Sequence, residues 1–142
     1  MPATYRQAVD QIQAVFKAAW DTTGFEARYP GQSSQPPEDA AGVPPTWARF
    51  TLRHGSGGQD SFTGGAQKVY LRTGIAIVQV FAPTEQGYGP SYDLAKVVSD
   101  AFQGTQTSGG VWFRNVRIDE IGVSGLWLQL NVSIGFQYDE IA

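Results

Sequence analysis

GLWLQLNVSIGFQYD, residues 125–139, is the stretch of this sequence that decides the fold. Apolar or aromatic side chains occupy every second position from Leu126 to Tyr138, which is the period of a β-strand with one buried face. The alternate positions carry neutral polar groups, glycine and one tryptophan: Trp127, Gln129, Asn131, Ser133, Gly135 and Gln137. A strand of this length needs neighbouring strands and a second layer over its apolar side. The chain must therefore supply both.

The composition limits the kind of molecule. A chain of 142 residues, 42% of them hydrophobic and 13% aromatic, can bury the core of one domain. The formal net charge is −3, and the ten Lys and Arg residues are scattered, so the basic patch of a nucleic-acid binder is missing. The absence of cysteine and the single histidine exclude disulfides, thiolate metal sites and paired-imidazole zinc sites. We expect one domain, residues 1–142, with no cofactor and no metal.

The N-terminal segment is amphipathic and lacks the basic start and apolar block of a signal peptide. No apolar run approaches the ~18 residues that a membrane span needs. We therefore expect a soluble protein that is made without export and has no membrane partner.

Two segments have helical periodicity. Apolar side chains recur at spacings of three and four through residues 3–22, and Gly24 follows as a stop signal. Residues 90–104 repeat the pattern, with Pro90 suited to a first turn and Gly104 to the end. Both stripes are wide enough to pack on a sheet.

Strand patterns fill most of the remaining sequence. Residues 47–54, 66–72, 74–83 and 111–123 precede the strand at 125–139, and the last two strands meet in a turn at Ser124 and Gly125. Residues 74–83 are apolar on both faces, which predicts a central strand covered on each side. The order of elements predicts an α+β fold, a mainly antiparallel sheet with two helices packed on one face.

Two connections have unusual compositions. Residues 29–45 hold five of the chain's eight prolines and predict an extended surface connection. Residues 55–65 are rich in glycine and predict a flexible loop that is disordered in the isolated chain. Phe62, its one large apolar side chain, is a candidate anchor for ordering the loop on assembly.

The residues with catalytic potential form no convincing active site, so we expect no enzyme activity. The glycine-rich loop matches neither phosphate-binding motif, and GVSGL at residues 122–126 departs from a nucleophile elbow. His54 follows an outward strand, where a solvated or hydrogen-bonded surface role is expected. Asp119 and Glu120 are strand neighbours, which point to opposite faces and therefore make no acid and base pair.

Two tryptophans stand on the polar faces of their strands. Trp47 lies beside Arg49 and Arg53, and Trp127 lies beside Gln129 and Asn131. In a monomer a helix would cover these rings; otherwise they are large apolar groups of the kind enriched in interface cores. These six residues and Phe62 are the candidate interface residues.

The succession of short motifs resembles the tail terminator-like family of phages and prophages, the minor tail proteins of long-tailed particles. The motifs are listed here in chain order: Trp47-x-Arg49, Arg72-x-Gly74, Gln79-Val80-Phe81-x-Pro83-x-x-x-Gly87, Asp93-Leu94-Ala95, Ala101-Phe102, Gly125-x-Trp127-x-Gln129-x-Asn131-Val132 and Phe136-x-Tyr138. The resemblance runs through residues 5–140.

The resemblance implies an α+β subunit that assembles into a hexameric ring. Such a ring is a structural virion component at the head-proximal end of the tail, assembled in the cytoplasm of the bacterial host. It caps the tail tube, contacts the tube protein and the head-tail connector protein, and lets DNA pass without specific binding. Two alternatives stay open: a head-to-tail connector or tail-completion subunit of the same ring type, and a small ligand-binding domain or hydrolase.

Overall fold

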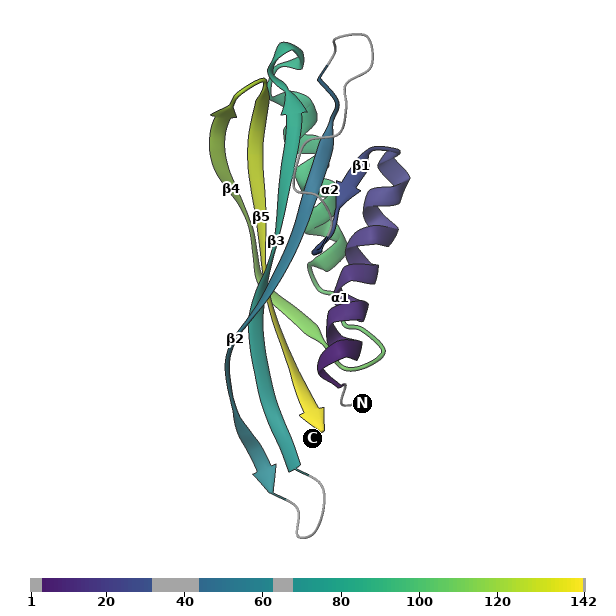
Figure 1. Ribbon diagram of the computed structural model, residues 1–142, viewed down its shortest axis with the longest axis vertical. Coiled ribbons are helices and arrows are strands. Elements are labelled where there is room, and N and C mark those ends of the chain that lie inside the picture. The colour runs from purple at the N-terminus through teal and green to yellow at the C-terminus, as the bar shows by residue number, and fades with distance from the viewer. Residues whose placement is uncertain (1–3, 32–43, 63–67, 142) are drawn as a thin grey trace.

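The protein is a twisted five-stranded sheet with both helices on one of its faces (Figure 1). The computed structural model describes residues 4–31, 44–62 and 68–141. This architecture confirms the predicted α+β class with a mainly antiparallel sheet. The long hairpin of the second and third strands projects past the ends of the helices (Figure 1).

Helix α1, Tyr5–Trp20, begins with a capping box in which Thr4 accepts from the Gln7 backbone N–H and the Gln7 side chain accepts from that of Thr4. Its apolar stripe is buried on the sheet. A short 3₁₀ turn η1, Asp21–Thr23, follows and ends at Gly24, whose φ of +77° favours glycine. The predicted helix and its stop signal are confirmed.

Helix α2, Gly89–Phe102, has Pro90 in its first turn as the sequence predicts, and it follows the 3₁₀ turn η2, Thr84–Gln86. Its buried side chains pack over the centre of the sheet and contact α1. The two helices therefore form one continuous layer.

The strands are β1 (Glu26–Arg28), β2 (Trp47–Phe62), β3 (Lys68–Pro83), β4 (Trp112–Ser124) and β5 (Trp127–Ile141). They lie in the order β1-β2-β3-β5-β4, with β1 parallel to β2 and every other pair antiparallel. The short strand β1 was not predicted, because three residues carry too little periodicity. The central place of β3 is confirmed.

The predicted glycine-rich loop at 55–65 is wrong over most of its length. Strand β2 continues to Phe62 and pairs with β3 as far as Lys68. The register slips between His54 and Gly57 and again between Gln59 and Ser61, and these irregularities take up the extra residues. A glycine run becomes strand here because β3 offers it a row of backbone partners.

Residues 66–72 and 74–83 are also not separate strands, since β3 runs unbroken through Gly74. A Cβ at Gly74 would lie 2.4 Å from Cζ of Phe136 and 2.5 Å from the carbonyl oxygen of Arg53. The glycine therefore marks a close approach inside a strand and no break. Of the proline-rich stretch 29–45, positions 32–43 lie outside the described residues.

The core lies between the helix layer and one face of the sheet. Phe50 of β2, Val78 of β3 and Val132 of β5 stand side by side in the register and are fully or almost fully buried beneath the helices. The aromatic part of the core adds Phe16 of α1, whose ring lies 5.2 Å from that of Phe50. Over the opposite face of the sheet, the described part of the chain places no helix (Figure 1).

Candidate assembly surface

The sheet face opposite the helices, called the open face below, carries the alternate residues of every long strand. Register joins them into rows that cross β2, β3, β5 and β4 in turn. The three rows nearest the start of β2 are Trp47–Phe81–Gln129–Gly122, Arg49–Gln79–Asn131–Asp119 and Thr51–Ile77–Ser133–Arg117. Strand alternation thus brings together candidates that are up to 84 positions apart in the sequence.

An aromatic cluster with one arginine forms one end of the open face. The rings of Trp47 and Phe81 stack with centroids 4.4 Å apart and planes 11° apart, and Trp127 meets Trp47 edge-on at 6.4 Å. The guanidinium of Arg49 lies 5.2 Å from the centroid of Trp47 and 5.6 Å from that of Phe81. These are favourable geometries for aromatic pairs and cation–π contacts.

The aromatic cluster explains how the ring of Trp47 is buried. Its ring is 1% exposed, and Arg49, Phe81 and Trp127 pack on it from its own sheet face. The sequence left open a covering helix or a partner, and the helices lie on the other face. Within the described residues the indole Nε1 of Trp47 has no hydrogen-bond partner, although the atom is buried.

Trp127 is hydrogen-bonded to the segment that precedes β2. Its indole Nε1 donates to the carbonyl oxygen of Pro45 at 2.7 Å, which places the residues just before β2 against the aromatic cluster. The ring is only half-buried. Trp127 therefore combines an internal tether with exposed apolar area.

Neutral hydrogen-bonding side chains continue the open face beside the cluster. Arg49 Nη1 donates to Oε1 of Gln79 at 3.0 Å, and Gln129 Nε2 donates to Oδ1 of Asn131 at 2.9 Å. At the far end of this row Asp119 accepts from Ser133 at 3.0 Å. The amides of Gln79, Gln129 and Asn131 form the neutral middle of this surface, between Arg49 and Asp119, and a partner could cover these amides without desolvating a charge.

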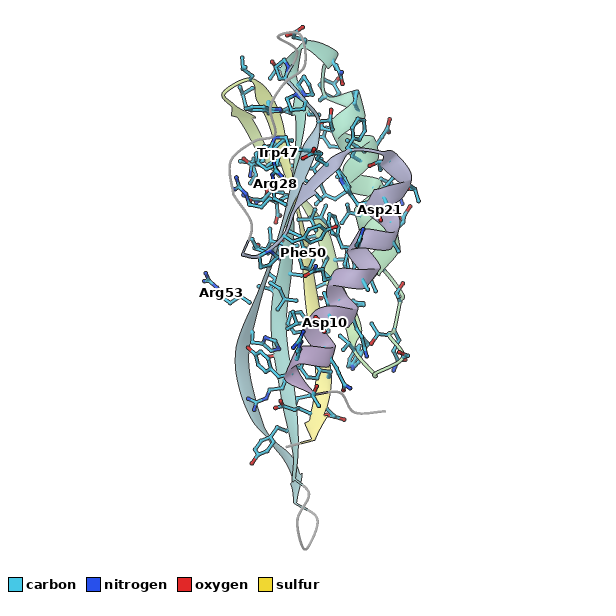
Figure 2. All side chains as sticks on the ribbon, turned by 45° about the vertical axis from the view of Figure 1, so that its right-hand side comes forward. Asp10, Asp21, Arg28, Trp47, Phe50 and Arg53 are labelled. Atoms are coloured by element: carbon cyan, nitrogen blue, oxygen red, sulfur yellow. The ribbon has the colours of Figure 1, made fainter. Side chains whose placement is uncertain are left out.

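A hollow of about 320 Å³ lies over the cluster. Its walls include four of the candidate residues, Trp47, Arg49, Trp127 and Gln129, together with Gln79, Phe81 and Gly125. Asn131 shares a row with Arg49 and Gln79 but is not part of the wall. Arg53 lies two rows further along and is exposed, and Figure 2 shows it extending away from the body of the protein. Phe62 lies at the distant end of the hairpin, and its side chain lies outside what the structure describes.

Sequence reasoning missed the contribution of β3. Phe81, Gln79, Ile77 and Ile75 all lie on the open face, and Ile75 is 37% exposed. The apolar pattern predicted a strand covered on both sides, but helices cover only one. The sequence did contain a usable signal. It predicts both helices on one face of the sheet, so the second apolar face of residues 74–83 has no predicted helix to cover it and points to an interface.

His54 has the hydrogen-bonded role that was one of the two expected for it, but it lies partly buried on the helix-covered face and not on an open surface. Its ring stacks on Tyr5 with centroids 3.8 Å apart, and its Nε2 shares a hydrogen bond with the Tyr138 hydroxyl at 2.6 Å. Burial lowers the pKa of His54, nearby Arg72 lowers it further, and Glu140 partly opposes them. Arg72 Nε lies 2.8 Å from Oε1 of Glu140. Helix α1 thus docks its first turn on a histidine that favours its neutral form.

The acidic neighbours Asp119 and Glu120 point to opposite faces, as predicted. Glu120 accepts from the Tyr92 hydroxyl on the helix side, whereas Asp119 pairs with Arg117 on the open face at 3.1 Å. Across the described part of the chain no group of three or more His, Cys, Asp or Glu is placed to hold a metal ion. None of its helices has the length and apolarity to cross a membrane.

Comparison with known proteins gives a likeness of fold. No family model matches the chain, and no curated protein matches it. Twelve solved chains do match. One of them, which bears only a sequence identifier, aligns over 91% of this chain and 94% of its own length with a TM-score of 0.57 at 19% identity. The chain therefore shares its fold with proteins of solved structure, and this likeness leaves function to be argued from the surface.

Proposed function

We propose that this protein is a structural subunit of a long-tailed phage or prophage particle, a tail terminator that forms a ring on the head-proximal end of the tail tube. The motif succession from Trp47 to Tyr138 supports the family. One observation of the structure carries the proposal: the sheet face on which neither described helix packs bears an aromatic hollow, a group of side-chain amides and the exposed Ile75.

A surface of this kind suits repeated contact between large partners. Its aromatic rings and Arg49 belong to the residue types enriched in interface centres. Paired amides cost less to bury than charges, so the row beside the cluster would add specificity at a small desolvation cost. The role is assembly, with no reaction and no cofactor.

The acidic balance of the chain supports the same proposal. DNA must slide through the lumen of such a ring, and every lysine or arginine facing the lumen would add a phosphate contact. A formal net charge of −3 keeps non-specific affinity for DNA low. The partners in the proposal are other copies of the chain, the tail tube protein and the head-tail connector protein.

Electron micrographs of particles made without this protein test the proposal. A missing terminator leaves tails of uncontrolled length, because nothing stops polymerisation of the tube. A missing connector or completion subunit leaves tails of normal length that are detached from heads. Normal particles with attached tails would refute both assignments and would favour the ligand-binding or hydrolase alternative.

A further inference from the structure

Two exposed arginines stand out on the open face because no acidic side chain shares their row. The row crosses the sheet as Arg53, Ile75, Gly135 and Arg114. The guanidinium of Arg114 lies 5.4 Å from the ring centroid of Trp112, which is 39% exposed. We call Arg53, Ile75, Trp112 and Arg114 the basic sheet patch. It combines two charges with exposed apolar area.

A patch of opposite character lies around the start of α2. Glu85 and Asp93 are exposed there, as are Tyr88 and Tyr92, which are 70% and 37% exposed. A hollow of about 320 Å³ opens between Tyr88, Tyr92 and the β4–β5 end of the sheet, with Glu120 in its wall. We call Glu85, Tyr88, Tyr92, Asp93 and Glu120 the acidic end patch.

The charges of the helix layer explain why this patch stays acidic. The basic residues of α1 and α2 each pair with an acid four positions on: Arg6 with Asp10, Lys17 with Asp21, and Lys96 with Asp100. Among the described residues of the helices and their 3₁₀ turns, Glu85 and Asp93 are the acids left over. Among the side chains that the structure describes on β2 to β5, the open face has the reverse balance, with four arginines, Arg49, Arg53, Arg114 and Arg117, and two aspartates, Asp119 and Asp139.

We propose that the basic sheet patch of one copy docks on the acidic end patch of the next copy. The inference rests on the proposed ring and names the surfaces that would meet in it. A symmetric sheet-to-sheet dimer would oppose arginine with arginine, which is unfavourable. A contact between two different faces instead repeats around a ring. The exposed Ile75 and Trp112 then meet the tyrosine-lined hollow, and the charges steer and orient the approach.

Charge reversal on purified full-length protein tests the docking. The sheet variant is Arg53→Glu with Arg114→Glu, the end variant is Glu85→Lys with Asp93→Lys, and the swapped variant carries all four changes. The matched control, Arg6→Glu with Lys17→Glu, reverses two exposed charges on α1. Mass is measured by light scattering and sedimentation over a range of protein and salt concentrations, and circular dichroism checks folding.

We expect rings of the natural and control proteins, and a loss of self-association of about tenfold or more in the sheet and end variants. An equimolar mixture of those two reversals should recover assembly in alternating order, because the unchanged sheet patch of the end variant meets the unchanged end patch of the sheet variant and the two reversed patches meet each other. The swapped variant alone should recover assembly as well. Higher salt should dissociate the natural ring, because surface charge pairs are screened.

Three outcomes would overturn the docking. The first is a natural protein that stays monomeric at every protein and salt concentration. The second is normal assembly of the folded sheet variant and the folded end variant. The third is assembly of the end variant when the sheet variant fails to assemble. The particle micrographs remain a separate test. Uncontrolled tail length together with normal assembly of both reversals would retain the terminator role and reject this pair of surfaces.

Discussion

Trp47 shows how a residue of an exposed pattern becomes buried without joining the core beneath the helices. It lies on the sheet face that has no helix, yet its ring is 1% exposed because Phe81, Arg49 and Trp127 close around it. A residue this buried is a poor probe of assembly, since its removal disturbs the monomer first. Trp127, which is half-buried, is the better probe.

Trp47→Ala should lower the free energy of unfolding by about 3–5 kcal/mol, because it leaves a cavity among stacked rings. Trp47→Phe should cost less, about 1–2 kcal/mol, since it keeps a ring and gives up no observed hydrogen bond of Nε1 within the described residues. Urea denaturation of the two variants checks the order. Equal losses would show that the indole nitrogen has a partner or that the ring is not packed as described.

His54 makes stability depend on pH in a defined direction. In the unfolded chain it binds a proton near its ordinary pKa of 6.5, and in the folded protein only at lower pH. The unfolded state therefore holds more protons in this window, so the free energy of unfolding should fall as the pH drops below about 6.5. Tyr138 stays protonated there because its pKa is raised to about 12.

His54→Gln is the variant that isolates this effect. It keeps a polar group near the Tyr138 hydroxyl and removes the titration, so the slope of unfolding free energy between pH 7.5 and 5.5 should become flatter. Denaturation at several pH values measures the slope, whatever the absolute stability of the variant. An unchanged slope would assign the pH dependence to other groups.

Among the elements, the β2–β3 hairpin departs most from sequence expectation. Two of its glycines differ in their surroundings. At Gly74 the Phe136 ring packs directly against the backbone and leaves no room for a side chain. At Gly55 an added Cβ would meet only the Thr73 carbonyl oxygen, at 3.8 Å. Sequence alone gives both the same meaning, a break or a flexible point. Packing across the sheet separates them.

Gly74→Ala should destabilise the protein by about 1–3 kcal/mol, because the new methyl overlaps a ring and a backbone oxygen. The matched change Gly55→Ala, in the neighbouring strand, should stay within about 0.5 kcal/mol. Thermal unfolding of the two variants gives the comparison. A tolerated Gly74→Ala would mean that Phe136 moves aside without loss.

For the whole molecule, the decisive feature is that two helices cover one face of a sheet whose other face is also partly apolar. Trp127→Ala together with Asn131→Asp should weaken assembly by about tenfold or more while the monomer stays folded, because the pair removes apolar area and adds a charge beside the neutral amides of Gln79 and Gln129. Sedimentation measures assembly, and circular dichroism measures folding.

Ala18→Asp, which adds the same single charge to the exposed side of α1, is the control and should leave assembly intact. The double variant is also supplied to particles made without the natural protein. If the folded double variant forms rings of normal stability and gives these particles tails of normal length, the aromatic end of the open face has no part in assembly.

Local pattern by itself determined both helices, the long last strand, the turn at Gly125 and the central place of β3. Apolar residues repeat with a period of about 3.6 in the helices and 2 in the strands, and turn residues mark the ends. These signals can be read from residues that are neighbours in the sequence. Only the tertiary structure decided that residues 55–62 pair as strand, that Trp47 is covered by its own sheet face and that His54 lies under α1. The pairing of residues 57–62 depends on strand partners six to fifteen positions away, and the places of Trp47 and His54 depend on Phe81 and Tyr5, which are 34 and 49 positions away. Strand register and helix docking fix the identity of these partners, which appears in no local pattern.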